Sequence, residues 1–213
     1  MKRNIEDIRK DYNKDILDEK DLDLNPILQF KRWFENALNS DVKEANALVL
    51  STVSRQGFPN ARVVLLKGLE SNGFRFFTNY NSAKGRDLNE CPKASMTFFW
   101  PELEQQIRIN GQVEKLSGKD SDLYFDSRPH GSKISALASN QSSKVNHRDE
   151  LTDEVLRLEK LYEHQEIERP EHWGGYLLIP NKIEFWQGRA SRLHDRFLYE
   201  DVEGQWKLSR LAP

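Results

Sequence analysis

The sequence of 213 residues predicts a mainly β protein, an antiparallel barrel decorated by helices. Short apolar and β-branched stretches alternate with tight turns such as Gln56-Gly-Phe-Pro59 and Ser71-Asn-Gly73. Helices do not alternate regularly with these stretches, as they would in a parallel sheet.

Before the strands, the first 20 residues are rich in charge, and Ile5, Ile8, Tyr12 and Ile16 recur at three- and four-residue steps. This thin apolar stripe predicts a weak helix, mobile unless it docks on the rest of the protein. A firmer helix should begin at Asn25-Pro26, an N-cap followed by proline at the first helical position. Its core-facing residues fall on one side: Ile27, Phe30, Trp33, Phe34, Ala37 and Leu38.

From residue 47 onward the pattern changes to the two-residue period of strands. We expect strands over residues 47–53, 61–67, 74–78, 94–100, 106–113, 176–179 and 182–186, the last two hinged at Pro180-Asn181. Between residues 113 and 176 the sequence predicts a helical insertion, with helices over about 118–128, after Gly131-Ser132 and over about 147–168. No repeat or low-complexity linker interrupts residues 21–213, which we expect to form one domain.

Composition excludes several classes of function. Charged residues make up 31% of the chain, but the formal net charge is only −2, so no general attraction for nucleic acid is expected. No apolar run approaches the roughly 20 residues of a membrane span, and the N-terminus lacks a signal-like apolar segment. Cys91 is the only cysteine, which suits a reducing compartment. We expect a cytoplasmic protein without nucleic-acid or membrane partners, and the histidine spacing predicts no metal site.

No glycine-rich phosphate-binding fingerprint is present, so a phosphate ligand would have to be held by side chains and helix ends. Arg62 and Lys67 bracket an apolar stretch and could serve this purpose, although each could equally end a strand in solvent. Lys84 follows a strand end and precedes a short helix, where an ammonium and backbone N–H groups could converge on a phosphate. As a pattern alone, this is also a common strand-to-helix turn.

A further cluster lies in the insertion. Tyr124 and Arg128 are four residues apart and would share a helix face, and Ser132 stands where the next helix should begin. Two hydroxyls, a guanidinium and a helix N-terminus would suit a phosphate dianion, although an ordinary capped helix pair would look the same.

The C-terminal segment holds the densest group of cations. Arg192, His194 and Arg196 are spaced by two and would share one face of an extended strand. Crowded cations are typical of a face that binds an anion or polar ligand. They also occur on edge strands, where they discourage aggregation. The spacing does not decide between these interpretations.

Arg192-Leu-His-Asp-Arg196, preceded by Phe185-Trp-Gln187 and followed by Trp206 and Arg210-Leu-Ala-Pro213, resembles the C-terminal signature of the pyridoxamine 5′-phosphate oxidase family. The resemblance covers nearly the whole chain, because several separated motifs recur in the same order. It implies an FMN-binding split β-barrel with a helical insertion, and a homodimer with FMN at the subunit interface. It also implies oxidation of pyridoxamine and pyridoxine 5′-phosphate to pyridoxal 5′-phosphate, with O2 as acceptor and H2O2 released.

The resemblance further implies roles for individual residues. Those expected to contact FMN are Arg62, Val63, Val64, Leu65, Leu66, Lys67, Phe77, Thr78, Lys84, Gln106, Gln141, Ser142, Trp186 and Arg196. Those expected to contact the substrate are Arg9, Tyr12, Lys67, Tyr124, Arg128, Ser132, Arg192 and His194, the last two at the reacting centre. The family often has a basic residue before the position of Lys84, where this chain has Ala83, so one phosphate contact is expected to be absent.

Two other functions fit parts of the sequence. A split-barrel flavin reductase or flavin-binding protein for another ligand would share the fold, but the intact Arg192-Leu-His194 pattern and the Tyr124, Arg128 and Ser132 cluster argue against it. A nucleic-acid-binding module could use the arginine-rich tail. The near-neutral charge and the lack of interleaved exposed aromatic residues disfavour it.

Overall fold

The computed structural model describes residues 4–8 and 10–213, and the chain divides into two compact units. The terminal unit comprises Met1–Leu50, Ser95–Gly111 and Pro180–Pro213, and the insertion unit comprises Ser51–Ala94 and Gln112–Ile179. The single domain over residues 21–213 stays a prediction.

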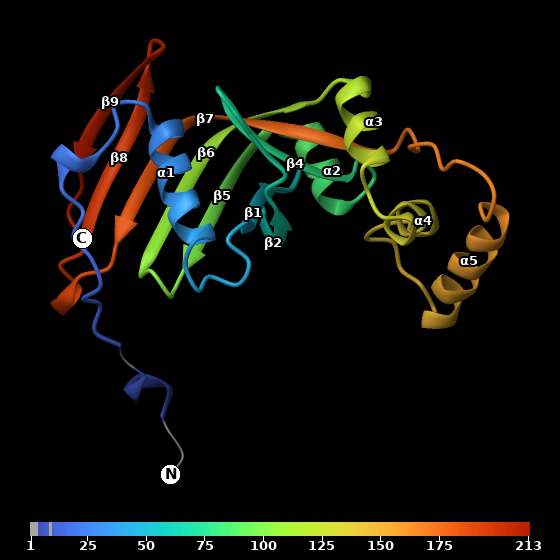
Figure 1. The fold of residues 1–213 in the computed structure, drawn as a ribbon, viewed down its shortest axis with the longest axis horizontal. Coiled ribbons are helices and arrows are strands. Elements are labelled where there is room, and N and C mark those ends of the chain that lie inside the picture. Colours follow the sequence, from blue (N-terminus) through green and yellow to red (C-terminus); the bar gives the residue numbers. More distant parts are fainter. Residues whose placement is uncertain (1–3, 9) are drawn as a thin grey trace. The chain divides into compact units, whose positions relative to one another are not determined.

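The predicted mainly β, antiparallel architecture is confirmed (Figure 1). The strands are β1 (Ala47–Val53), β2 (Pro59–Leu65), β3 (Gly68–Glu70), β4 (Gly73–Asn79), β5 (Lys93–Trp100), β6 (Gln105–Lys115), β7 (Trp173–Gln187), β8 (Asp195–Val202) and β9 (Gln205–Arg210). The sheet order is β2-β1-β5-β6-β7-β4-β3, with β8 paired to β7 and β9 paired to β8.

Two expected strands form one. The prediction of a hinge at Pro180-Asn181 was wrong, since β7 continues through this dipeptide. The register explains why proline is tolerated. β7 pairs with β4 as far as Leu178 and with β8 from Lys182 onward, so Pro180 lies where the strand changes partner and neither pairing requires its N–H.

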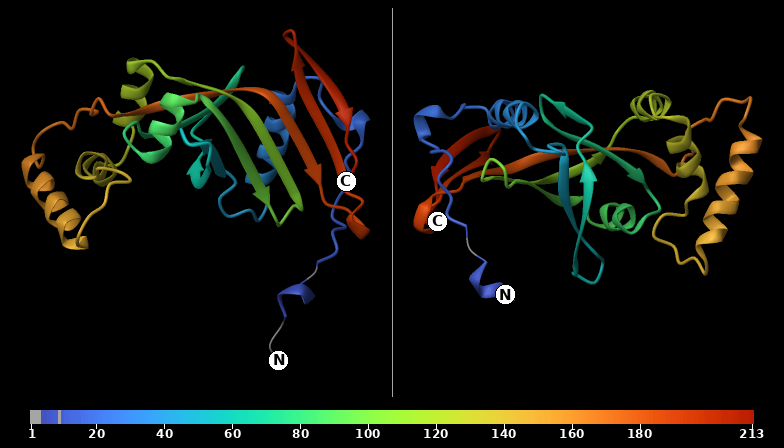
Figure 2. Two further views of the ribbon diagram at one scale, coloured as in Figure 1. Left: turned by 180° about the vertical axis from the view of Figure 1, so that it is seen from behind. Right: turned by 60° about the horizontal axis from the view of Figure 1, so that its bottom comes forward.

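In the terminal unit, helix α1 (Pro26–Leu38) begins as predicted, because the Asn25 side chain accepts a hydrogen bond from the Ile27 N–H at 2.9 Å. Its apolar face packs through Trp33 on Phe185 of β7, with ring centroids 5.2 Å apart. The Tyr199 hydroxyl of β8 donates to the Asp23 carbonyl at 2.7 Å and fixes the chain that enters α1. Figure 2 shows α1 beside the β8–β9 hairpin from two further sides.

The insertion unit contains the predicted helices as α3 (Gly118–Asp126), α4 (His130–Ala138) and α5 (Arg148–Leu161), of which the last is shorter than expected. They pack around one apolar cluster with Trp173, at the start of β7. The members of this cluster are Phe125, Ile134, Ala136, Leu158, Ile167 and Trp173. The short helix α2 (Ala83–Glu90) follows the end of β4.

Two further expectations were wrong. No α-helix forms among residues 4–8 and 10–20; two single 3₁₀ turns, Ile5–Asp7 and Glu19–Asp21, occur instead. Arg192, His194 and Arg196 do not share a strand face, because β8 begins only at Asp195. Ser191 and Arg192 have left-handed φ values of 55° and 61° and turn the chain before the strand.

Candidate functional site

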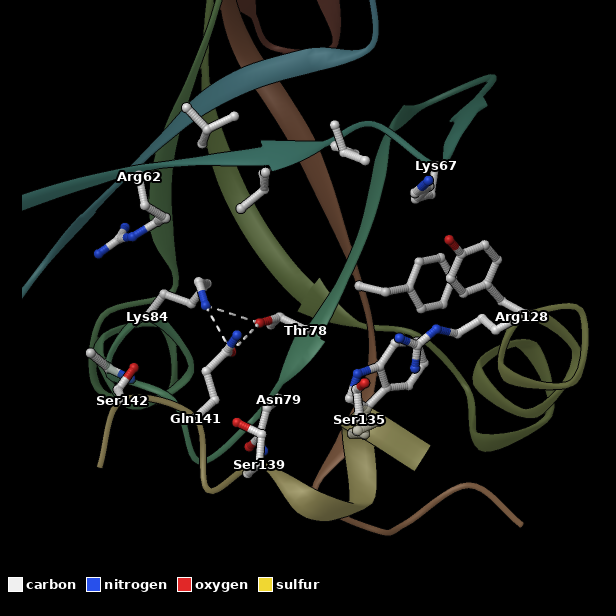
Figure 3. Close-up of a pocket in the computed structure, with 18 residues that line it drawn as sticks. Arg62, Lys67, Thr78, Asn79, Lys84, Arg128, Ser135, Ser139, Gln141 and Ser142 are labelled. Carbon is white, nitrogen blue, oxygen red and sulfur yellow. Dashed lines mark hydrogen bonds between the residues drawn. The ribbon is translucent and has the colours of Figure 1, made fainter. Parts of the chain in front are cut away.

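A cavity of about 690 Å³ in the insertion unit is lined by β2, β4, the start of α2 and the helical insertion (Figure 3). It brings together twelve of the residues that the sequence predicted: Arg62, Val63, Val64, Leu65, Lys67, Phe77, Thr78, Lys84, Tyr124, Arg128, Gln141 and Ser142. Six lining residues were not predicted: Asn79, Ala83, Ser135, Ala136, Ser139 and Trp173. Leu66, which is buried, and Ser132 do not line it.

One end of the cavity holds a buried ammonium. Lys84 is only 9% exposed, and its Nζ donates to Thr78 Oγ1 at 3.1 Å, Gln141 Oε1 at 3.0 Å and Ser82 Oγ at 3.3 Å. These partners are all neutral. The pKa of Lys84 is lowered from 10.5 to about 8, mainly by burial and to a smaller extent by the nearby charge of Arg62. A buried cation surrounded by neutral oxygens is suited to an anionic ligand.

The backbone supports the same end. Ser82 is the N-cap of α2, and its hydroxyl accepts a hydrogen bond from the Gly85 N–H at 3.2 Å. The Ala83 N–H donates to Ser142 Oγ at 3.1 Å, which ties the polar loop after α4 to the start of α2. A helix N-terminus attracts anions through its free N–H groups and dipole. Ala83 adds no charge here, as the sequence indicated.

Arg62 is held by polar residues that the sequence analysis did not single out. Its Nη1 donates to Thr52 Oγ1 at 2.8 Å and to the Asn60 carbonyl at 3.0 Å. Asp87 of α2 lies behind them and accepts from the Thr52 hydroxyl at 2.6 Å and from Asn60 Nδ2 at 3.0 Å. Burial lowers the pKa of the Arg62 guanidinium, and Asp87, 4.0 Å away, opposes that shift. Nothing local distinguishes Asp87 from an ordinary acidic residue on a short helix.

The other end of the cavity is built around Arg128, between α3 and α4. Its guanidinium lies 4.5 Å from the Trp173 ring centroid and 5.5 Å from that of Phe125. Its Nη1 is buried without a hydrogen-bond partner in the described part of the chain. Burial lowers the pKa of this guanidinium. An unsatisfied buried donor is costly, so an acceptor supplied by a ligand would satisfy it. Figure 3 shows Lys67 on the same side of the cavity as Arg128, away from Lys84.

A second cluster lies in the terminal unit, where a cavity of about 480 Å³ is bordered by Tyr12, Arg192 and His194. The His194 ring lies 4.6 Å from Trp186 and 5.9 Å from Tyr12, between ring centroids. The Arg189 N–H donates to His194 Nδ1 at 3.1 Å, so a neutral imidazole carries its proton on Nε2. Burial, and then the charges of Arg192 and Arg196, lower the pKa of His194 and favour this neutral form.

Two other predicted residues are placed differently. Arg196 is ion-paired, with its Nε 2.8 Å from Glu184 Oε1 and its Nη1 donating to the Ala212 carbonyl at 2.8 Å. Gln106 lies on β6 in the terminal unit and lines neither cavity. Arg9 falls outside the described residues. The roles of all these site residues stay predictions.

Among the described residues, no group of three or more His, Cys, Asp and Glu side chains could hold a metal ion. Within the same ranges, every helix is too short or too polar to cross a membrane.

Comparison with known proteins supports one family. The model of the pyridoxamine 5′-phosphate oxidase family matches residues 34–162, and that of the pyridoxine 5′-phosphate oxidase C-terminal dimerisation region matches residues 173–213. Curated proteins named pyridoxine/pyridoxamine 5′-phosphate oxidase from Nostoc punctiforme and Pseudomonas putida are 51% and 50% identical to this chain, each over 100% of both chains.

Two solved structures are similar in fold. PhzG from Burkholderia lata, crystallised with tetrahydrophenazine-1-carboxylic acid, is 33% identical with a TM-score of 0.88, over 93% of this chain and 98% of that one. A pyridoxamine 5′-phosphate oxidase-related, FMN-binding protein from Nostoc punctiforme has a TM-score of 0.69 at 19% identity, over 86% and 97% of the two chains. These likenesses confirm the predicted FMN-binding split β-barrel fold.

Proposed function

Because the chain belongs to the pyridoxamine 5′-phosphate oxidase family, we propose that it oxidises pyridoxamine 5′-phosphate and pyridoxine 5′-phosphate to pyridoxal 5′-phosphate. It is an oxidoreductase with FMN as cofactor. When bound, FMN would supply the two-electron chemistry: a hydride would leave the C4′ carbon of the substrate, and O2 would be reduced to H2O2 with that hydride and the proton that the substrate loses. The alcohol then becomes the aldehyde directly, whereas the amine becomes an imine that water hydrolyses with loss of ammonia.

The observation that carries the proposal is that one cavity has two cationic ends. Lys84 and Arg62 lie at one end, and Arg128 and Lys67 lie at the other (Figure 3). Among residues 4–8 and 10–213, the buried ammonium at the first end has neutral partners alone, and a buried guanidinium N–H at the second end has no acceptor. FMN and a phosphorylated B6 vitamer bring two phosphate groups, one for each end.

The chain's own residues bind and orient both molecules. Lys84, Thr78 and Ser142, with Gln141 and Arg62, hold the FMN phosphate. Arg128, Lys67 and Tyr124 hold the substrate phosphate. Binding energy from a phosphate remote from C4′ thereby fixes the geometry at the reacting carbon.

The terminal unit supplies the second set of contacts. Arg192 and His194 hold the substrate ring over the flavin, with His194 Nε2–H as a neutral donor, and Trp186 and Arg196 flank FMN. We assign these four residues to the second subunit of a homodimer. The match of residues 173–213 to a C-terminal dimerisation region supports this assignment, because that range contains all four.

An anaerobic absorbance experiment tests the function. The purified protein loaded with FMN should lose its flavin absorbance when pyridoxamine 5′-phosphate or pyridoxine 5′-phosphate is added under nitrogen. Air should restore the absorbance, with one H2O2 and one pyridoxal 5′-phosphate formed per turnover. Pyridoxamine without its phosphate should act far more slowly. Flavin that bleaches only with a nicotinamide reductant would instead indicate a flavin reductase, and no bleaching with either B6 phosphate would contradict the proposal.

A further inference from the structure

A buried carboxylate in the terminal unit holds the segment formed by residues 10–17. Glu104 lies in the turn between β5 and β6, and its side chain is only 2% exposed. Its Oε2 accepts hydrogen bonds from the backbone N–H groups of Asn13 at 2.8 Å and Lys14 at 3.0 Å. The Lys10 ammonium lies 3.3 Å from its Oε1. In the described part of the chain, these hydrogen-bond and ion-pair partners of the carboxylate all come from residues 10–14.

The docked segment supplies the groups that stabilise the negative charge of the Glu104 carboxylate. Burial alone would raise the pKa of its carboxyl, but the N–H groups of Lys14 and Asn13 and the Lys10 ammonium more than offset that effect. The pKa therefore lies below its usual value, and the group is ionised at neutral pH. If the segment left, the carboxylate would lose two charge-assisted hydrogen bonds and its ion pair with Lys10.

The segment that Glu104 holds carries Tyr12. The Tyr12 ring meets Trp186 edge-on, with centroids 5.7 Å apart, and borders the same cavity as Arg192 and His194. Tyr12 also packs directly on Gly188, where no room is left for a larger side chain. A Cβ added at Gly188 would lie 2.7 Å from Tyr12 Cγ and 2.8 Å from Tyr12 Cβ.

Glu104 is itself bonded to the chain just before Arg189, which lines this cavity. Its backbone carbonyl accepts from the Gly188 N–H at 2.8 Å and from Gln187 Nε2 at 3.3 Å. Gln187 directly follows Trp186 at the end of β7. Glu104 therefore joins the end of β7, through its backbone carbonyl, to the segment that carries Tyr12, through its side chain.

We propose that Glu104 is a positioning residue: it clamps the backbone after Tyr12 and thereby holds that ring against Trp186 and His194, completing the pocket around Arg192. The proposal rests on the proposed function in one respect, that this pocket forms part of the substrate site. The clamp itself does not depend on the reaction.

Two variants test the clamp from opposite sides. Glu104→Gln keeps the shape of the side chain but removes its charge. Gly188→Ala leaves Glu104 intact and pushes Tyr12 away through steric contact. Glu102→Gln is the matched control, with the same substitution two residues earlier in the same turn and no contact to the segment among the described interactions. All three are studied as FMN-loaded full chains.

Hydrogen exchange of the Asn13 and Lys14 amides reports on the clamp without any substrate. Exchange should be at least about tenfold faster in Glu104→Gln and Gly188→Ala, because charge-assisted hydrogen bonds are lost or displaced. It should be unchanged in the control. Unchanged exchange in Glu104→Gln would overturn the clamp. If that variant does not fold, Glu104→Asp, which keeps the charge but shortens the reach to the Asn13 and Lys14 N–H groups, decides this point.

Steady-state kinetics test the positioning role. In both variants KM for pyridoxine 5′-phosphate should rise by about tenfold while kcat and FMN content stay nearly constant, because the loss concerns binding rather than chemistry. Faster exchange with unchanged KM would overturn the positioning role of Tyr12 while retaining the clamp. If the wild-type enzyme oxidises neither B6 phosphate, the proposed function and the positioning role both fail, whereas the exchange experiment still decides the clamp.

Discussion

Replacing Lys84 with methionine should have opposite effects on stability and on FMN binding. Burial lowers the pKa of the ammonium from 10.5 to about 8. Since one pKa unit corresponds to about 1.4 kcal/mol, keeping the group charged at neutral pH without FMN costs on the order of 3 kcal/mol. Methionine removes this cost but gives up three hydrogen bonds to neutral oxygens. We expect Lys84→Met without FMN to be more stable than wild type by about 1–2 kcal/mol.

The same substitution should weaken FMN binding. A charge-assisted hydrogen bond contributes about 1.5–3 kcal/mol, so the Kd should rise by about ten- to a hundredfold. The wild-type Kd should also rise above about pH 8, because FMN then binds to an amine that must first take up a proton. Lys84→Met should lack this pH dependence.

The stability of the wild-type apoprotein should itself depend on pH. Between about pH 8 and 10.5 the unfolded chain binds more protons than the folded one at Lys84, so the free energy of unfolding should rise with pH. Urea unfolding at neutral pH and at about pH 9.5, with titration of flavin fluorescence, measures both effects. Lys119→Met, at an exposed lysine on α3, is the control. If Lys84→Met destabilises the apoprotein by more than about 1 kcal/mol, the neutral oxygens already satisfy the ammonium and the reasoning is wrong.

Three further predictions concern the remaining site residues. Arg128→Ala should weaken substrate binding by about ten- to a hundredfold with flavin retained, as KM and flavin content measure; loss of flavin with KM unchanged would contradict the division between the two ends of the cavity. Arg192→Ala should reduce kcat far more than FMN content, and unchanged turnover would exclude its role at the reacting centre. His194→Phe should lose less stability in acid than wild type does, because a lowered His194 pKa means that the unfolded chain binds more protons near about pH 6.5, so wild-type stability falls as pH drops through that range. If the urea midpoints of both proteins fall by the same amount between neutral pH and about pH 5.5, this prediction is refuted.

Much of the fold could be predicted because its signals are local. The Asn25 cap, the turns between strands and the alternation of residues 106–113 each depend on a few neighbouring residues, and each led to an element that the structure contains. Once the strands and the insertion were in place, the family resemblance supplied which of their residues face the ligand. Twelve of these line one cavity.

The errors arose where contacts between distant parts of the chain determine the local structure. Pro180 was read as a hinge because its neighbours alone cannot reveal that β7 changes partner there. Asp87 and Glu104 were missed because their partners lie 35 and 91 residues away, at Thr52 and Asn13. The left-handed turn at Ser191 and Arg192 was missed because neither residue type favours that conformation.

The structure also separates two kinds of basic residue that look alike in the sequence. Arg196 and Arg210 have carboxylate partners, Glu184 at 2.8 Å and Asp195 at 3.0 Å, so their charges are already compensated within the protein. Within the part of the chain that the structure describes, the partners of Lys84 are all neutral, and Arg128 keeps a buried donor unsatisfied. Keeping uncompensated cations buried lowers the stability of the protein without its ligand. Such a cost is expected where an anion restores the balance on binding, so Lys84 and Arg128, rather than the paired Arg196 and Arg210, indicate where phosphate should bind.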